Sequence, residues 1–98
     1  MITRFVKMHF KPELKKDFIF LFYESVEVIK KFEGCLDVVL LEDADDESSL
    51  CTLSFWKDLS HLENYRKSAL FDGVWSYTKT LFSDKPEAWS VDRLVTLN

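Results

Sequence analysis

The chain has 98 residues, of which 47% are hydrophobic and 15% aromatic, and its formal net charge is −4 at pH 7. This length suits one domain, residues 1–98. An acidic chain lacks the excess of positive charge that binds a nucleic-acid backbone, so we expect no nucleic-acid partner. The longest apolar run, residues 18–23, falls far short of the roughly 20 residues of a membrane span. Apolar and polar residues alternate over the first ten positions, which differs from the pattern of a signal peptide. We therefore expect a cytoplasmic protein with no membrane contact.

The first two elements are predicted from two different hydrophobic periods. Residues 2–10 alternate between two faces, which is typical of a strand. Pro12 suits the first turn of a helix, and apolar residues then recur at spacings of three and four up to Phe32. Gly34 is placed to cap this helix, so we expect a helix over 12–32.

Two further strands are predicted over 35–42 and 49–57, joined as a hairpin by the polar segment 43–48. That segment lacks the glycine and the final glutamate of a calcium loop, so we interpret it as a turn. The hairpin register places Cys35 and Cys51 too far apart for a disulfide, and we expect both to be reduced and buried.

The second helical region is predicted from its caps. Ser60 and Glu63 have the spacing of a capping box, and Ser68 is placed to cap either a continuation or a second piece over 69–81. Residues 88–95 have the Trp, Val and Leu content of a last strand.

This order of elements predicts a ferredoxin-like βαββαβ fold of the α+β class, with the helices on one face of a four-stranded antiparallel sheet. In the hairpin strands both faces carry apolar side chains, so the helices cannot cover them all. The simplest cover for the second face is the same face of another copy. We therefore expect a homodimer through the helix-free face of the sheet.

Several segments resemble a known family. They are RFVKMHFKPE near the start, FEGC after the first helix, and the spacing W-x8-Y-x2-S-x2-F of Trp56, Tyr65, Ser68 and Phe71. Over nearly all 98 residues the chain is similar to the antibiotic biosynthesis monooxygenase family, whose members form dimeric α+β barrels. The resemblance implies either a cofactor-free oxygenase of phenolic or quinol substrates or a haem-degrading oxygenase.

The chain departs from two branches of that family. Where haem-degrading members have an iron-ligating His and an Asn, this sequence has Trp75 and either Val6 or Lys7, and an indole has no lone pair for a metal. Where members that oxidise aromatic polyketides have an Asn and a helical Arg, this sequence has Thr52 and, as closely as it can be aligned, Ser76.

One face of the third predicted strand combines small polar residues with a large ring: Thr52, Ser54 and Trp56. If this face meets the helices, the small side chains leave a void that Tyr65 and Trp75 would line, and that void would suit a planar aromatic ligand. The alternative is that these aromatic residues simply complete a Phe-rich core.

Few charged or titratable residues are candidates for the ligand site. Arg4 lies among apolar residues and would either anchor a phenolate or carboxylate of a ligand or pair with an acidic side chain. His9 and His61 titrate near neutral pH, but their positions suggest the dimer face and solvent. The catalytic residues therefore stay unassigned, with Trp56 and Arg4 as candidates, and no motif indicates a metal site.

The sequence thus predicts a cofactor-independent monooxygenase of a small aromatic substrate, with no cofactor or metal. The candidate substrate-binding residues are Arg4, Thr52, Ser54, Trp56, Tyr65 and Trp75. Three alternatives stay open: a non-catalytic dimer that binds an aromatic or haem-like molecule, a haem-degrading oxygenase that lacks the usual His ligand, and a purely structural dimer with a filled core.

Overall fold

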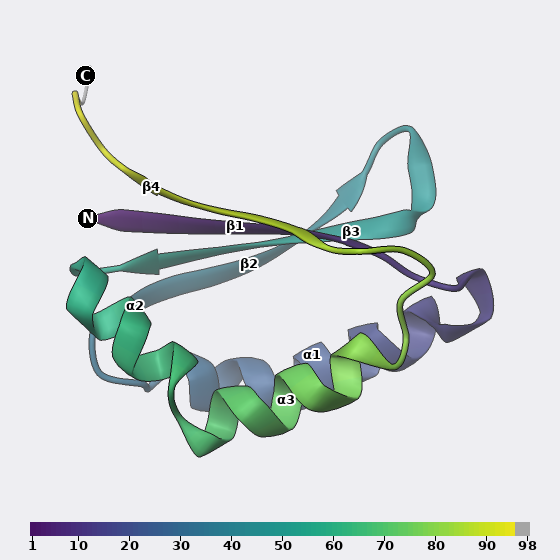
Figure 1. Ribbon diagram of the computed structural model, residues 1–98, viewed down its shortest axis with the longest axis horizontal. Helices are drawn as coiled ribbons and strands as arrows, with labels where there is room; N and C mark the ends of the chain where they lie inside the picture. Colours follow the sequence, from purple (N-terminus) through teal and green to yellow (C-terminus); the bar gives the residue numbers. More distant parts are fainter. Residues whose placement is uncertain (96–98) are drawn as a thin grey trace.

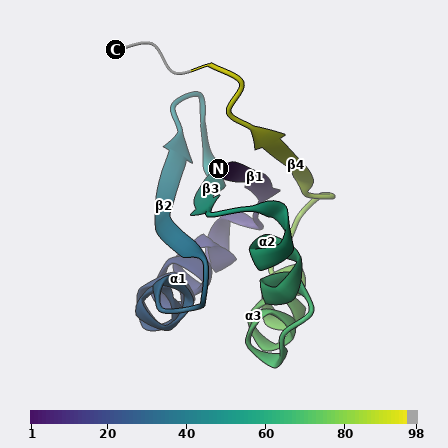
Figure 2. The ribbon, with the colours of Figure 1, turned by 90° about the vertical axis from the view of Figure 1, so that its left-hand side faces the viewer.

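A computed structural model describes residues 1–95 as an α+β fold of two layers. Its four-stranded antiparallel sheet has the order β2-β3-β1-β4. All three α-helices lie on one face of this sheet, and the other face is left open (Figures 1 and 2). The elements are β1 (Ile2–His9), α1 (Lys15–Lys30), β2 (Cys35–Asp43), β3 (Asp46–Trp56), α2 (Leu59–Arg66), α3 (Ala69–Lys79) and β4 (Glu87–Asp92).

The predicted ferredoxin-like βαββαβ order is confirmed, with the second helical region divided into α2 and α3. Ser68 takes an extended conformation at this break, and its hydroxyl accepts a hydrogen bond from the backbone N–H of Phe71. It therefore caps a second helix, which is one of the two roles that its position predicted.

The first helical region differs at both ends from the predicted range 12–32. Pro12–Leu14 form a 3-10 turn, and the α-helix begins at Lys15 and ends at Lys30. Gly34 does adopt a left-handed backbone with φ of +86°, but it lies in the turn that enters β2, four residues past the helix end. Its role is therefore in that turn and not in the helix cap.

The cap of α2 was predicted wrongly. Asp58 takes the extended N-cap conformation, and its carboxylate accepts from the backbone N–H of His61, whereas Ser60 lies inside the first turn and donates to Asp58. A carboxylate placed before the first turn also interacts well with the positive end of the helix dipole.

The hairpin and the last strand also differ from their predicted bounds. Residues 46–48 belong to β3, so the turn is tighter than the predicted loop. Cys35 lies opposite Trp56 and Cys51 opposite Leu41, and both thiols are free, but Cys35 is only partly buried. β4 ends before the predicted residue 95 because its partner β1 begins at Ile2.

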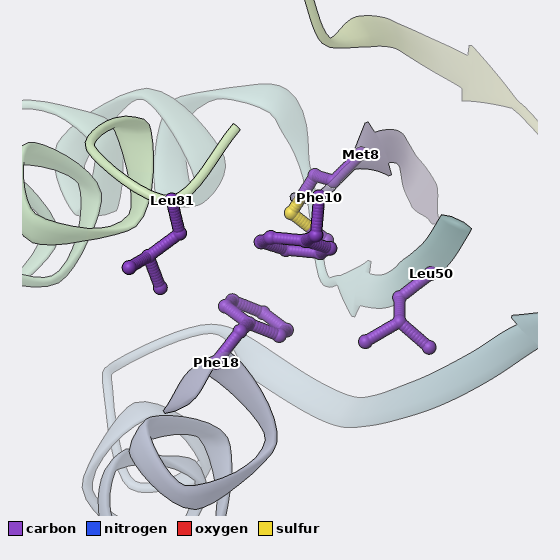
Figure 3. Close-up of a cluster of buried hydrophobic side chains, with 5 residues drawn as sticks. All are labelled: Met8, Phe10, Phe18, Leu50 and Leu81. Atoms are coloured by element: carbon purple, nitrogen blue, oxygen red, sulfur yellow. The ribbon is translucent and has the colours of Figure 1, made fainter. Parts of the chain in front are cut away.

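The tightest part of the core lies between the sheet and the helices, near the end of β1 (Figure 3). The rings of Phe10 and Phe18 stack there with their centroids 4.9 Å apart. Burying such side chains is the main source of stability for a chain of this size. The members of the cluster are Met8, Phe10, Phe18, Leu50 and Leu81.

The face of the sheet away from the helices carries an apolar row across all four strands. The strand register places Val39, Leu53, Phe5 and Trp89 side by side, on the face opposite to the residues that point towards the helices. Figure 2 shows no helix of residues 1–95 on that face. Residue Trp89 is 47% exposed. Within the same residues, no helix combines the length and the apolar character that crossing a membrane requires.

Candidate functional site

A cavity of about 220 Å³ lies between the sheet and the helices. Its lining residues come from the sheet, from α1, and from α2 and α3. Figure 2 shows α1 on one side below the sheet and α2 with α3 on the other. Arg66 and Ala88 are the exposed residues of its lining, so the cavity opens beside α2 and β4.

The cavity exists because small side chains stand where two layers would otherwise meet. On β3, Thr52 lies opposite Val6, and Ser54 lies opposite Arg4. On β4, Ala88 is the neighbour of Val6 on the other side, and Ser25 faces the cavity from α1. Helices and sheets pack through interdigitated side chains, so this run of small residues leaves space that larger ones would fill.

Stacked aromatic rings form the inner wall. Tyr65 lies over Trp56 with ring centroids 5.0 Å apart and an interplanar angle of 27°, and Phe71 and Trp75 stack at 6.0 Å. The indole N–H of Trp56 donates to the Ser54 hydroxyl at 2.9 Å. Trp56 is completely buried, so Tyr65 and Trp75 offer more surface to a ligand, and Trp56 supports Tyr65 from behind.

Tyr65 is the one phenol of the cavity lining within residues 1–95. Burial, with a smaller contribution from the nearby Cys35, raises its pKa to about 12. The phenol therefore stays protonated at neutral pH, and its hydroxyl can donate a hydrogen bond to an anionic ligand.

Two guanidinium groups line the mouth. Arg4 donates to the Ser90 hydroxyl at 2.9 Å and takes part in no ion pair with residues 1–95. Burial and the positive charge of Arg66 lower the pKa of Arg4, and Glu63 offsets part of this effect. Glu63 itself contacts Arg66 at 3.4 Å. The lining of the mouth thus has two cations, and one carboxylate outside the lining is paired with Arg66.

The structure brings all six predicted binding residues to this cavity: Arg4, Thr52, Ser54, Trp56, Tyr65 and Trp75. Arg66 was missed by the sequence prediction. Its spacing of three from Glu63 is that of an ordinary surface ion pair on a helix, and the adjacent Tyr65 was the available signal that this turn approaches the cavity.

Neither histidine lines the cavity. Nδ1 of His9 lies 2.8 Å from the Ser49 hydroxyl on the outer face of the sheet, and Nδ1 of His61 lies 2.8 Å from the Asp58 carboxylate. The lining contributed by residues 1–95 contains no His, Cys, Asp or Glu, and no three such side chains in that range are grouped to hold a metal ion. Within this range, no side chain of the lining is placed as a general base at neutral pH.

Comparison with known proteins identifies related sequences and folds. The family model for antibiotic biosynthesis monooxygenase matches residues 1–74. Over 76 residues, 78% of the chain, the sequence is 26% identical to a protein of Natronomonas pharaonis that bears the name "Putative heme-binding protein". The chain spans 13% of the length of that protein.

Solved structures share the whole fold. A conserved protein from Methanosarcina mazei has a TM-score of 0.86 at 25% identity, covering 93% of this chain and 91% of its own. A crystal structure of an antibiotic biosynthesis monooxygenase has a TM-score of 0.88 at 19% identity, covering 97% of this chain and 100% of its own. Similarity at 19% identity shows the fold alone.

Proposed function

The chain belongs to the antibiotic biosynthesis monooxygenase family, and on this premise we propose that it oxidises a small phenolic or quinol-like aromatic in the cavity without a cofactor. One observation carries the proposal: an apolar cavity walled by stacked rings has at its mouth a guanidinium, Arg4, that forms no ion pair with an acidic side chain of residues 1–95. Such a site suits a flat ligand with an anionic group.

The size of the cavity limits the ligand. A cavity of about 150 Å³ accepts benzene, and typical drug-sized pockets exceed about 300 Å³. The observed 220 Å³ lies between these values, so we expect a substrate of one or two rings. Its ring would lie against Tyr65 and Trp75, and the hydroxyls of Thr52 and Ser54 would bond to its oxygen atoms.

The reaction needs dioxygen as its oxidant and no further reductant. The phenolate gives electrons to dioxygen, one oxygen atom replaces a ring hydrogen to form a quinone carbonyl, and the other leaves as water. For 1-naphthol the products are 1,4-naphthoquinone and water, which balances all atoms. The residues would serve by favouring the anion and excluding water, which strengthens the electrostatic interactions.

Deprotonation is the step for which the lining from residues 1–95 offers no base. The positive charges of Arg4 and Arg66 would instead lower the pKa of the bound phenol, so that the substrate ionises through its own acidity. A substrate with an acidic hydroxyl is therefore expected to react faster than a weakly acidic one.

The test is oxygen uptake by the purified protein with 1-naphthol, a quinol and anthrone, together with product analysis. We expect uptake that matches quinone formation, loss of most uptake in Arg4→Gln, and retention in Glu47→Gln, an exposed carboxylate of the hairpin. Binding without uptake would instead identify a non-catalytic aromatic-binding protein. No binding to the wild type would contradict both functions.

Haem is a second candidate ligand because of the similarity to the protein of Natronomonas pharaonis. Haem iron requires a His, Cys, Met or phenolate ligand. In the lining from residues 1–95, Met8 is packed into the core cluster, and the raised pKa of Tyr65 disfavours its phenolate. The residues present do not fit haem ligation, and we expect titration with hemin to give no ligated Soret band.

We further propose that the protein is a homodimer through the helix-free face of the sheet. The apolar row formed by Val39, Leu53, Phe5 and Trp89, of which Trp89 is exposed and the others are partly buried, supports this arrangement, because a continuous apolar surface is commonly covered by a partner. A two-fold contact lets the same row of a second copy serve as the cover.

A further inference from the structure

The mouth of the cavity has more positive charge than its own residues neutralise. Arg4 and Arg66 both line it, and Glu63 contacts Arg66 at 3.4 Å. Two cations and one carboxylate leave a net charge of +1. A monoanion would neutralise this charge, whereas a dianion would reverse it.

The hydrogen-bond donors of the mouth are also in excess. Arg4 uses one N–H on the Ser90 hydroxyl, and Arg66 makes one contact with Glu63. A guanidinium carries five N–H donors in a planar fork that matches the two oxygens of a carboxylate better than the single oxygen of a phenolate. The pair of guanidinium groups therefore favours a carboxylate over a lone phenolate at this point.

The remaining lining has the opposite character. The inner part of the cavity is formed by aromatic and aliphatic side chains such as Trp75, Phe22 and Ile29, where a charged group would lose its hydration without a partner. A ligand that fits both parts has a ring at one end and a negative charge at the other.

We propose that this site takes a small hydroxylated aromatic monocarboxylate, with its carboxylate bound between Arg4 and Arg66 at the mouth and its ring between the sheet and the helices. The inference deepens the proposed function, on which it rests for the location of the ligand. It gives both guanidinium groups to the carboxylate, so the ring hydroxyl of such a ligand would bond to Thr52 and Ser54 instead of lying at the two cations. It makes Arg66 a residue that determines specificity.

The test compares 6-hydroxy-2-naphthoate with its amide, which has the same shape and no charge, by quenching of tryptophan fluorescence at pH 7. We expect the carboxylate to bind about tenfold or more tightly than the amide, because hydrogen bonds to charged groups contribute more than neutral ones. Rising salt should reduce this preference, since Arg66 is 40% exposed.

Two variants and one matched control test whether the preference for the carboxylate arises at the mouth. Arg4→Gln and Arg66→Gln should each reduce the preference for the carboxylate by about tenfold while the amide binds as before. Lys67→Gln removes the same charge from the neighbouring, exposed position outside the lining and should retain the preference. Unchanged binding of the amide also shows that each variant keeps its fold.

Equal binding of carboxylate and amide, no binding of either, or a preference that survives both arginine variants would overturn this inference. The proposed function has its own readout, which is oxygen uptake. Preferential binding of the carboxylate without uptake of oxygen from any phenolic substrate would contradict only the monooxygenase. Uptake with 1-naphthol and no preference for the carboxylate would contradict only the inference.

Discussion

Individual residues of the cavity have environments that differ sharply over short distances. Tyr65 is largely buried against Trp56, whereas Arg66, the next residue, is 40% exposed at the mouth. Successive residues of a helix point about 100° apart, so one turn of α2 supplies both an apolar wall and a cation. This contrast makes the site suitable for a ligand that has one apolar and one charged end.

The raised pKa of Tyr65 can be measured directly. In an alkaline titration followed at 295 nm, the difference between the wild type and Tyr65→Phe should show one phenol that ionises near pH 12 instead of near 10.0. Because the folded-state pKa is raised, the stability contributed by the buried phenol is present below pH 10 and is lost as the pH rises towards 12. A difference transition near pH 10 in the folded protein would contradict the burial of this group.

The absence of a base from the lining of residues 1–95 predicts how turnover depends on pH. For a series of substituted phenols, the pH at half-maximal kcat/KM should follow the pKa of each phenol, because the substrate and not a side chain ionises. Measurement of kcat/KM from pH 5 to 10 for three phenols tests this. A single apparent pKa shared by all three would instead indicate a titrating group of the protein.

At the scale of elements, the turn between α1 and β2 depends on Gly34. Its φ of +86° disfavours any other residue, and an added Cβ would lie 2.2 Å from Cγ of His61. The close approach of this turn to α2 helps to define how the first βα unit meets the second helical region.

We expect Gly34→Ala to lower the free energy of unfolding by more than about 1–2 kcal/mol, the usual cost of a left-handed conformation for a non-glycine residue. The loss of unfolding free energy beyond this cost comes from displacement of His61. In a His61→Gly background the same substitution should cost only about 1–2 kcal/mol, since the ring of His61 and its Cβ, which would lie 2.3 Å from the added Cβ, are both gone. Urea unfolding of the four proteins measures this coupling, and equal costs in both backgrounds would contradict the contact.

The start of α2 depends on Asp58. Hydrogen bonds from the Ser60 hydroxyl, the His61 backbone N–H and the His61 ring lower the pKa of the Asp58 carboxyl to about 2. Asp58→Ala should therefore reduce the melting temperature by several degrees, and Ser60→Ala by less.

The pH dependence of this effect follows from the lowered pKa. The stability contributed by Asp58 is present above its ordinary pKa of 3.8 and is lost as the pH falls towards 2. Melting curves between pH 2 and 6 should show the difference between the wild type and Asp58→Ala shrinking over that window. A difference that stays constant down to pH 2 would exclude the ionised cap as its cause.

At the scale of the whole molecule, helices cover only one of the two faces of the sheet. The helices bury one face around the core and the cavity, whereas the row of Val39, Leu53, Phe5 and Trp89 has no cover within residues 1–95. Phe5 and Trp89 pack together with centroids 5.4 Å apart and still leave Trp89 half-exposed.

Leu53→Glu should separate the proposed dimer into monomers, because two like charges would be buried face to face in a two-fold contact. Phe20→Glu is the matched control, since Phe20 is 67% exposed on α1, on the other side of the molecule. Sedimentation at micromolar concentration should find a dimer for the wild type and the control and a monomer for Leu53→Glu. A monomeric wild type would overturn the proposed dimer.

The sequence by itself determined the order of the elements and the faces of the strands, because hydrophobic period and local turn residues carry that information. It therefore predicted that Thr52, Ser54 and Trp56 share a face, and the structure turns this face to the helices. It could not locate helix ends to the residue, since Asp58 and Ser60 are both good capping residues and only the path of the chain selects one.

Only the tertiary structure decided what those faces enclose. Arg4 and Arg66 are 62 positions apart in the sequence and line one mouth because the fold brings β1 and α2 to the same cavity. Whether small side chains leave a cavity depends on how closely two layers approach, which no local pattern encodes. The charge of the mouth likewise arises from residues brought together by folding, so it appears only once distant segments are placed in space.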